Sequence, residues 1–328
     1  MRNWMRILAA VLLAGMPGLV RGDGPEAPWW RQQKIRFMWG QWNHERVDLE
    51  VDNWGMNRKL GQNKDIEFSR RLFKDIAAAG ATVFVELEGY RPIHASHAHD
   101  FGMKYFATRY VATLSSVEGR KWVNESGKHH WVCPLDQDAY ERWMFEMRND
   151  ESILEGVKEG LVDGIVVDWE PYGGHGEAGL CYCDVCMAVF PGFAELGQKL
   201  PPLDRRDEWI EKQGLADAFK DHRHERRIAM WTNIRKKLHA IKPDLLFGNY
   251  DKWVEDFSQA MHTREAPFII ADAQHYFNDQ RQPWWWSYGS VFKDRGYLYI
   301  PGAWANGLFG AQASEVGAAR WIYEAAIN

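Results

Sequence analysis

The sequence lacks the features that mark membrane-spanning, nucleic-acid-binding and disordered proteins. After the apolar run Ile7–Val20, no stretch of the 328 residues is long and apolar enough to span a membrane. Positive charge is not in excess, since 40 Lys and Arg stand against 45 Asp and Glu, a net charge of −5. Nucleic-acid binding by counterion release normally requires a basic surface. The 46% of hydrophobic residues is ample for a folded core, and there is neither an internal repeat nor a low-complexity tract.

Two common catalytic signatures are also missing. No Gly-x-Ser-x-Gly elbow occurs, so a serine hydrolase triad is unsupported. The residues after the first expected strand read Gly40-Gln41-Trp42-Asn43, which is not the glycine-rich loop that binds dinucleotide phosphates.

Cysteine is scarce, but its spacing is informative. Of the four cysteines, three lie within six residues, as Cys181-x-Cys183-x-x-Cys186, and Cys133 lies far ahead of them. Outside the cytosol, four cysteines suggest two disulfides, with three connectivities. If Cys133 comes close in space, a structural four-cysteine zinc site is the alternative, and free thiols are the third. A catalytic metal is not expected, because four protein ligands leave no open position.

The N-terminus has the pattern of an export signal. Arg2 and Arg6 precede the apolar run Ile7–Val20, whose about 14 residues match a signal-peptide core better than a membrane span of about 20. Val20-Arg21-Gly22 is an acceptable cleavage site. We therefore expect residues 1–22 to be a removed signal peptide and the mature protein to be secreted or periplasmic. An uncleaved membrane anchor is the alternative.

What the chain has in abundance is aromatic side chains, with 18 Trp, 12 Tyr and 16 Phe. Flat rings stack on sugar faces, although they also serve packing and interfaces.

Short apolar runs alternate with longer helical patterns, which predicts a parallel sheet covered by helices. The expected strands are Ile35–Trp39, Thr82–Glu86, Lys104–Ala107, Gly164–Asp168, Leu245–Asn249, Phe268–Asp272 and Tyr297–Pro301. The expected helices are Glu67–Ala79, Asp136–Glu159, Arg206–Ile241, Val254–His262 and Glu315–Ala326. This rhythm favours an α/β fold of the (β/α)8 TIM-barrel type over a doubly wound sheet. Residues 23–328 would form one catalytic domain, with an insertion after the fourth strand.

The count of strands stops one short of a closed barrel. Either an eighth strand lies within residues 42–53, or the chain ends before its last strand, and we expect the latter.

The most informative segment is Asp163–Tyr172. Strand alternation places Val166, Asp168 and Glu170 on one face, which in a parallel barrel points inward, and the two acids lie at the carboxyl end, where barrels carry catalysis. Two neighbouring acids do not both ionise easily, so one should keep its proton, as a general acid for glycosidic cleavage must. The alternative is that both acids cap a neighbouring loop.

The run Asp163-Gly-Ile-Val-Val-Asp-Trp-Glu170 resembles the fourth-strand signature of family 18 glycoside hydrolases, Asp-Gly-Ile-Asp-Leu-Asp-Trp-Glu. The resemblance implies that Glu170 is the catalytic acid and that Asp168 is its partner. The middle Asp of the signature, which holds the substrate's acetamido group in that family, is Val166 here. This departure argues against substrate-assisted catalysis, so we predict a glycoside hydrolase barrel in the broad sense.

Without substrate assistance, the reaction needs a second carboxylate about 5–5.5 Å from the acid for retention, or about 6.5–9.5 Å for inversion. Asp272, at the end of the sixth expected strand, is the first candidate for nucleophile or base. Glu86, Glu88 and Asp251 are the next candidates. For each of them, a supporting hydrogen bond or salt bridge is the alternative role.

Aromatic and polar residues at the same strand ends would bind a carbohydrate substrate. The predicted substrate-binding residues are Trp39, Trp42, Glu88, Asn249, Tyr250, Gln274, Tyr276 and Trp304. No cofactor is expected apart from the structural zinc considered above, and no nucleic-acid or membrane partner after signal removal.

Two other functions remain open. A glycan-binding barrel without hydrolytic activity would explain Val166. A metal-dependent hydrolase would use His94, His97, His99 and Asp100, which we expect in a loop after the second strand. Hydrogen bonding to sugars or loop structure is the preferred role for these histidines.

Overall fold

A computed structural model describes residues 28–39, 70–71, 73–78, 80–86, 89–146, 152–169, 180–196, 199–250, 254–274 and 291–303. The expected signal peptide, the region 42–53 and the expected helix Glu315–Ala326 lie outside these described residues.

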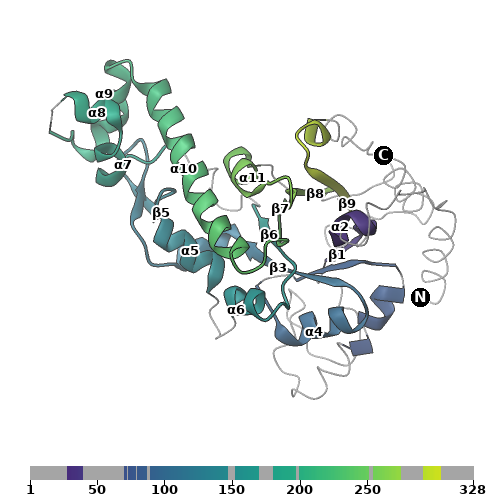
Figure 1. The fold of residues 1–328 in the computed structure, drawn as a ribbon. Helices are drawn as coiled ribbons and strands as arrows, with labels where there is room; N and C mark the ends of the chain where they lie inside the picture. Colours follow the sequence, from purple (N-terminus) through teal and green to yellow (C-terminus); the bar gives the residue numbers. More distant parts are fainter. Residues whose placement is uncertain are drawn as a thin grey trace.

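The centre of the fold is a seven-stranded parallel sheet that curls on itself (Figure 1). Its strands, in both spatial and chain order, are β1 (Phe37–Trp39), β2 (Val83–Val85), β3 (Lys104–Tyr110), β6 (Gly164–Asp168), β7 (Leu246–Tyr250), β8 (Ile269–Gln274) and β9 (Leu298–Ala303). Each corresponds to one of the seven strands expected from the sequence, and every neighbouring pair is parallel. The described residues therefore form a partial, TIM-barrel-like sheet, and the expectation that the chain ends before an eighth strand stays a prediction.

Helices cover the outer face of this sheet. They are α4 (Pro92–Asp100), α5 (Gln137–Phe145), α6 (Ile153–Lys158), α10 (Ala216–His239) and α11 (Glu255–Met261). Side chains from the helices, such as Trp231 and Phe257, join Val167 and Phe247 of the strands in the main hydrophobic core. Within the described ranges, no helix is long and apolar enough to cross a membrane.

The inner face of the curled sheet has its own smaller core. Val166 of β6 packs there with Phe106 of β3 and Leu246 of β7, whereas the next residue, Val167, belongs to the outer core. This is the period-two alternation of a strand that is buried on both faces. At the amino end of the strands, the short helix α2 (Trp29–Gln32) covers the inner core, with Trp29 edge-on to Phe106.

Two helices expected from the sequence are each divided in two. The span Asp136–Glu159 contains α5 and α6, and each begins at its own cap: Asp136 accepts a hydrogen bond from Ala139 N, and Ser152 accepts one from Glu155 N. The span Arg206–Ile241 contains α9 (Arg206–Lys212) and α10, separated by Gly214, whose φ of 68° ends a right-handed helix. Local capping and a glycine, rather than apolar spacing, set these boundaries.

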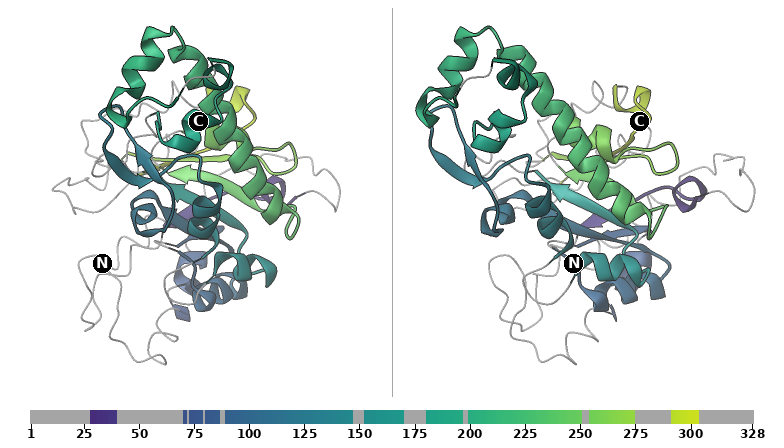
Figure 2. Two further views of the ribbon diagram at one scale, coloured as in Figure 1. Left: turned by 90° about the vertical axis from the view of Figure 1, so that its left-hand side faces the viewer. Right: turned by 60° about the vertical axis from the view of Figure 1, so that its left-hand side comes forward.

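A second unit projects from the sheet beyond β3 and β6. After β3, the chain forms the 3-10 helix η2 (Val111–Ser116) and the hairpin β4 (Lys121–Val123) and β5 (His129–Val132), which the sequence reading missed. After β6, it forms α7 (Asp184–Ala188), α8 (Pro191–Leu196), η3 (Leu203–Arg205) and α9. These elements share a separate hydrophobic core, here called the insertion core, and Figure 2 shows α10 running from this unit to the sheet.

Candidate functional site

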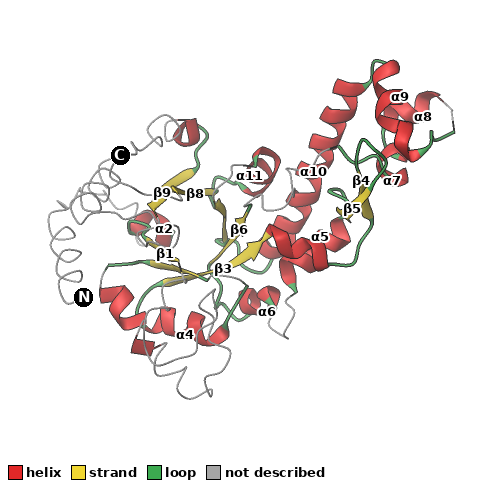
Figure 3. Cartoon of the chain, turned by 180° about the vertical axis from the view of Figure 1, so that it is seen from behind, coloured by secondary structure: helices red, strands yellow, loops and turns green. Residues whose placement is uncertain are grey.

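The candidate site lies at the carboxyl end of β6, in the middle of the sheet (Figure 3). Asp168 is the last residue of this strand and is partly exposed, whereas the four residues before it are buried. By register it pairs with Tyr110 of β3 on one side and with Tyr250 of β7 on the other. Because neighbouring strands are about 4.8 Å apart, these three residues form a row across three strands.

Alternation from Val166 places Asp168 on the inner face, and its neighbour Trp169 holds this orientation. Trp169 is buried on the helix side, where its ring lies 5.5 Å from Phe257 and 6.3 Å from Trp231, measured between centroids. Since successive residues of an extended chain point to opposite faces, anchoring Trp169 outward fixes Asp168 inward. The order Asp-Trp thus combines a polar residue on the inner face with an aromatic anchor on the other.

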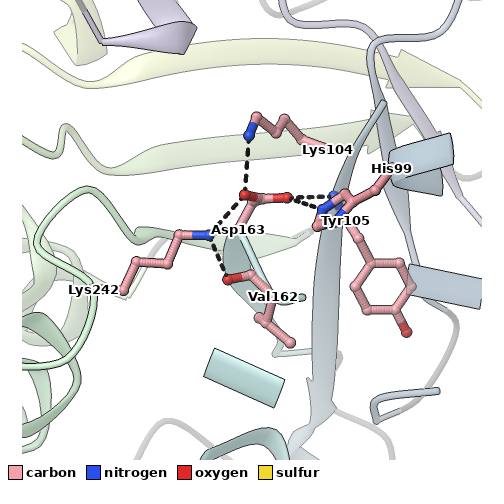
Figure 4. Close-up of polar contacts among 6 residues, drawn as sticks. All are labelled: His99, Lys104, Tyr105, Val162, Asp163 and Lys242. Atoms are coloured by element: carbon pink, nitrogen blue, oxygen red, sulfur yellow. Dashed lines mark hydrogen bonds and ion pairs between the residues drawn. The ribbon is translucent and has the colours of Figure 1, made fainter. Parts of the chain in front are cut away.

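Asp163, at the amino end of the same motif, has a structural role (Figure 4). Its carboxylate is bound by His99 Nε2 at 2.6 Å, Lys242 Nζ at 2.7 Å, Tyr105 N at 3.0 Å and Lys104 Nζ at 3.2 Å. Burial opposes ionisation of Asp163, but the hydrogen bond from His99 and the two lysine charges outweigh it and lower its pKa well below the usual range. Asp163 is therefore an ionised carboxylate that links β6 to β3, α4 and the segment before β7. It lies at the opposite end of β6 from Asp168.

Glu86 is a second buried carboxylate, located between β2 and α4. Its Oε2 accepts a hydrogen bond from the Tyr105 hydroxyl at 2.9 Å, and His94 Nδ1 lies 2.8 Å from the same oxygen. Burial raises the pKa of Glu86, but His94, Arg91 and Tyr105 together bring it below the ordinary value. The pKa of Tyr105 is raised, first by burial and then by the charge of Glu86. Glu86 thus has the supporting role that the sequence left as its alternative.

The histidines expected in a loop lie instead on helix α4, which begins at Pro92. They face different partners: His94 contacts Glu86, His99 contacts Asp163, and Asp100 pairs with Arg70. The sequence reading missed this helix because it contains three histidines and has no apolar stripe. In the part of the chain that the structure describes, the four cysteines are the only group of three or more potential metal ligands that come together.

The structure places the other predicted site residues unevenly. Tyr250 lies in the inner core beside Asp168. Asn249, the residue before it, is completely buried and points to the opposite, helix-covered face of the sheet. Trp39 of β1, and Asp272 and Gln274 of β8, are described only in their backbone positions. The remaining predicted residues lie outside the described residues: Glu170, Trp42, Glu88, Asp251, Tyr276 and Trp304.

Tyr110 was missed from the sequence, because the expected third strand ended at Ala107 and the observed strand continues for three more residues. The signal was the alternation of Phe106, Thr108 and Tyr110, which extends the inner face to the carboxyl end of β3.

The four cysteines come together, as one of the sequence alternatives required. Cys133, Cys181, Cys183 and Cys186 are all buried, and none is in a disulfide. Their Sγ atoms lie within 4.8 Å of one another.

No protein-family model matches the chain, and no curated protein matches it. Among solved structures, the chain is similar to the β-glucuronidase of Parabacteroides merdae, with a TM-score of 0.41 and 8% sequence identity. The match covers 86% of this chain and 27% of that chain, so this chain spans about a quarter of the length of that structure.

Proposed function

We propose that the protein is an exported glycoside hydrolase whose reaction takes place at the carboxyl end of β6. The observation that carries the proposal is the position of Asp168: it is the partly exposed end of the inner face of the central strand, between Tyr110 and Tyr250. Parallel α/β barrels carry their catalytic groups at this end of the sheet.

In the proposed mechanism, Glu170 is the general acid that protonates the glycosidic oxygen. Asp168, two residues earlier, remains ionised; its negative charge keeps the proton on Glu170 and then stabilises positive charge that develops on the sugar ring. The half-buried ring of Tyr110 would contact the sugar, because a phenol combines a flat apolar face with a hydrogen-bonding tip, whereas Tyr250, only 4% exposed, would pack beneath the sugar site. Asn249 has no part in this proposal, since its side chain is buried under the helices.

Asp272 is the candidate that the sequence offers for nucleophile or base. It lies in β8, two strands from Asp168, and its backbone pairs in register with Pro301 of β9. Of the two residues that begin β8, Ile269 packs in the inner core and Ile270 in the outer core. Strand alternation gives position 272 the same face as Ile270, the outer one, so the backbone does not support Asp272 as a partner of Asp168, and its role is tested separately from that of Glu170.

A second candidate function is glycan binding without hydrolysis. It is favoured by Val166, which is fully buried in the inner core at the position where the family 18 signature has its middle Asp. An apolar side chain there cannot donate to or accept from a substrate group.

The test measures reducing-sugar release from a panel of plant, algal and microbial polysaccharides. Glu170→Gln, Asp168→Asn and Asp272→Asn are compared with the parent chain and with Asp244→Asn, an exposed carboxylate before β7, at the amino end of the sheet. We expect release by the parent and by the control, with losses of about 100-fold or more in the first two variants, since the first lacks the general acid and the second lacks the charge that keeps the proton on it. A loss of the same size in Asp272→Asn would assign the second carboxylate to Asp272. Equal release by Glu170→Gln and the parent would refute the mechanism. Binding of a glycan without release by the parent would establish the second candidate.

A further inference from the structure

The cysteine cluster is a built site in the insertion unit and has no part in the proposed reaction. Cys133 follows β5 directly, whereas Cys181, Cys183 and Cys186 surround the start of α7, about fifty residues later. Cys133 Sγ lies 3.4 Å from Cys186 Sγ and 3.9 Å from Cys183 Sγ. All four side chains are almost completely inaccessible, with at most 6% of each residue exposed.

These distances match a tetrahedral thiolate site. Zinc–sulfur bonds of about 2.3 Å place the four sulfurs of a tetrahedron about 3.8 Å apart. The sulfurs approach one another as a group of four rather than as two separate pairs, which is the arrangement that one shared ion requires. Since four cysteines fill the coordination sphere, such an ion would be structural and would have no open position for catalysis.

The surroundings supply positive charge that a tetrathiolate site, with a net charge of −2, needs. The N–H of Cys133 donates to the carbonyl of Arg120 at 2.6 Å, which brings Arg120 next to the cluster. The Arg120 guanidinium donates from Nη2 to the carbonyl of Leu135, two residues after Cys133, at 2.9 Å, so its charge lies beside the cluster.

We propose that Cys133, Cys181, Cys183 and Cys186 bind one structural zinc ion that joins the β4–β5 hairpin to the insertion after β6. Other contacts join the same two segments: Tyr182 N donates to Val123 O at 2.9 Å, and Trp122 Nε1 donates to Leu180 O at 3.0 Å. The insertion core is small, and a small core gains much from a metal link.

The ion would also act on the proposed active-site end of the sheet. The segment that carries Cys133 leaves the carboxyl end of β3 after Tyr110, and the segment that carries the other three cysteines follows the carboxyl end of β6 after Asp168. A link between these two segments would restrain the chain where it leaves β3 and where it leaves β6, on either side of the candidate site.

The first experiment measures metal content and thiol state in the full chain, purified without reductant and without a metal-affinity step. We expect about one zinc ion per chain and zinc X-ray absorption spectra that show four sulfur neighbours. The four cysteines should react with an alkylating reagent only after the chain is denatured in the presence of a chelator. Two disulfides by intact mass, or four reduced thiols without bound metal, would overturn the proposal. Iron in place of zinc would overturn the identity of the ion.

The second experiment separates metal binding from folding. Cys186→Ser removes a ligand and should lose the bound zinc, whereas Cys186→His supplies a ligand nitrogen and should retain it. Removal of zinc from the parent chain with a chelator should lower its unfolding temperature, and added zinc should restore it. If the chelator leaves both zinc content and unfolding temperature unchanged while Cys186→Ser still holds a full equivalent of zinc, the metal lies elsewhere and the proposal is wrong.

Discussion

Replacement of Asp163 by Asn tests whether the amino end of the Asp163–Glu170 motif has a structural role, in contrast to the catalytic role proposed for its carboxyl end. The carboxylate accepts from four donors, two on each oxygen. The Asn oxygen can still accept hydrogen bonds from both lysines, and the Asn amide group can donate to His99. The donor left without an acceptor is then the buried N–H of Tyr105. An unsatisfied buried donor costs about 1–3 kcal/mol, and the lost charge adds to it. Since Lys104 and Lys242 keep some exposure, 32% and 16%, they regain part of their hydration. We therefore expect a loss of about 2–4 kcal/mol in the free energy of unfolding at pH 7.

The pH dependence of this loss follows from the lowered pKa of Asp163. Because the pKa is lower in the folded than in the unfolded chain, the carboxylate stabilises the fold fully above the unfolded value of about 3.9, and this stabilisation is lost as the pH falls below it. The difference between parent and variant should shrink as the pH falls below about 3.9, at a rate that approaches about 1.4 kcal/mol per pH unit.

Urea unfolding of the parent, Asp163→Asn and the exposed control Asp244→Asn at several pH values between 7 and 3 measures both effects. A difference below about 0.5 kcal/mol at pH 7, the size of an ordinary surface substitution, would refute the structural role of Asp163. So would a difference that stays constant down to pH 3.

Three further substitutions test the packing around the sheet, each measured by urea unfolding. Gly164→Ala would place a Cβ 2.5 Å from the ring of Phe106, so we expect a loss of about 1–3 kcal/mol, and an unchanged stability would show that the ring can move. Asp256→Asn breaks a buried ion pair with Arg227, 2.6 Å apart, and should cost about 3–5 kcal/mol. The double change Arg227→Met with Asp256→Leu should cost less than this single change, because it leaves no buried charge, and a larger cost would contradict the reasoning. Ser152→Ala removes the cap of α6 and should cost about 1 kcal/mol, an effect that Ser152→Thr should largely avoid.

The alternation of apolar runs predicted the strands well, because a strand buried on both faces must be apolar over its whole length. All seven expected strands are present, and Gly164–Asp168 has the expected bounds. The helix boundaries were less accurate: the caps at Asp136 and Ser152 and the turn at Gly214 interrupt patterns that looked continuous. Such interruptions depend on local hydrogen bonds and on φ values, which apolar spacing does not record.

For the candidate site, the sequence by itself determined the face of Asp168, since the period of a strand is fixed by its backbone. Only the tertiary structure decided which residues stand beside it, because the register between Tyr110, Asp168 and Tyr250 joins strands that are far apart in the chain. The same holds for the cysteines: their spacing left disulfides, zinc and free thiols open, and the approach of Cys133 to the other three required the folding of two distant segments onto one core. Local periodicity is encoded within a few residues, whereas the meeting of distant side chains depends on the packing of the whole chain.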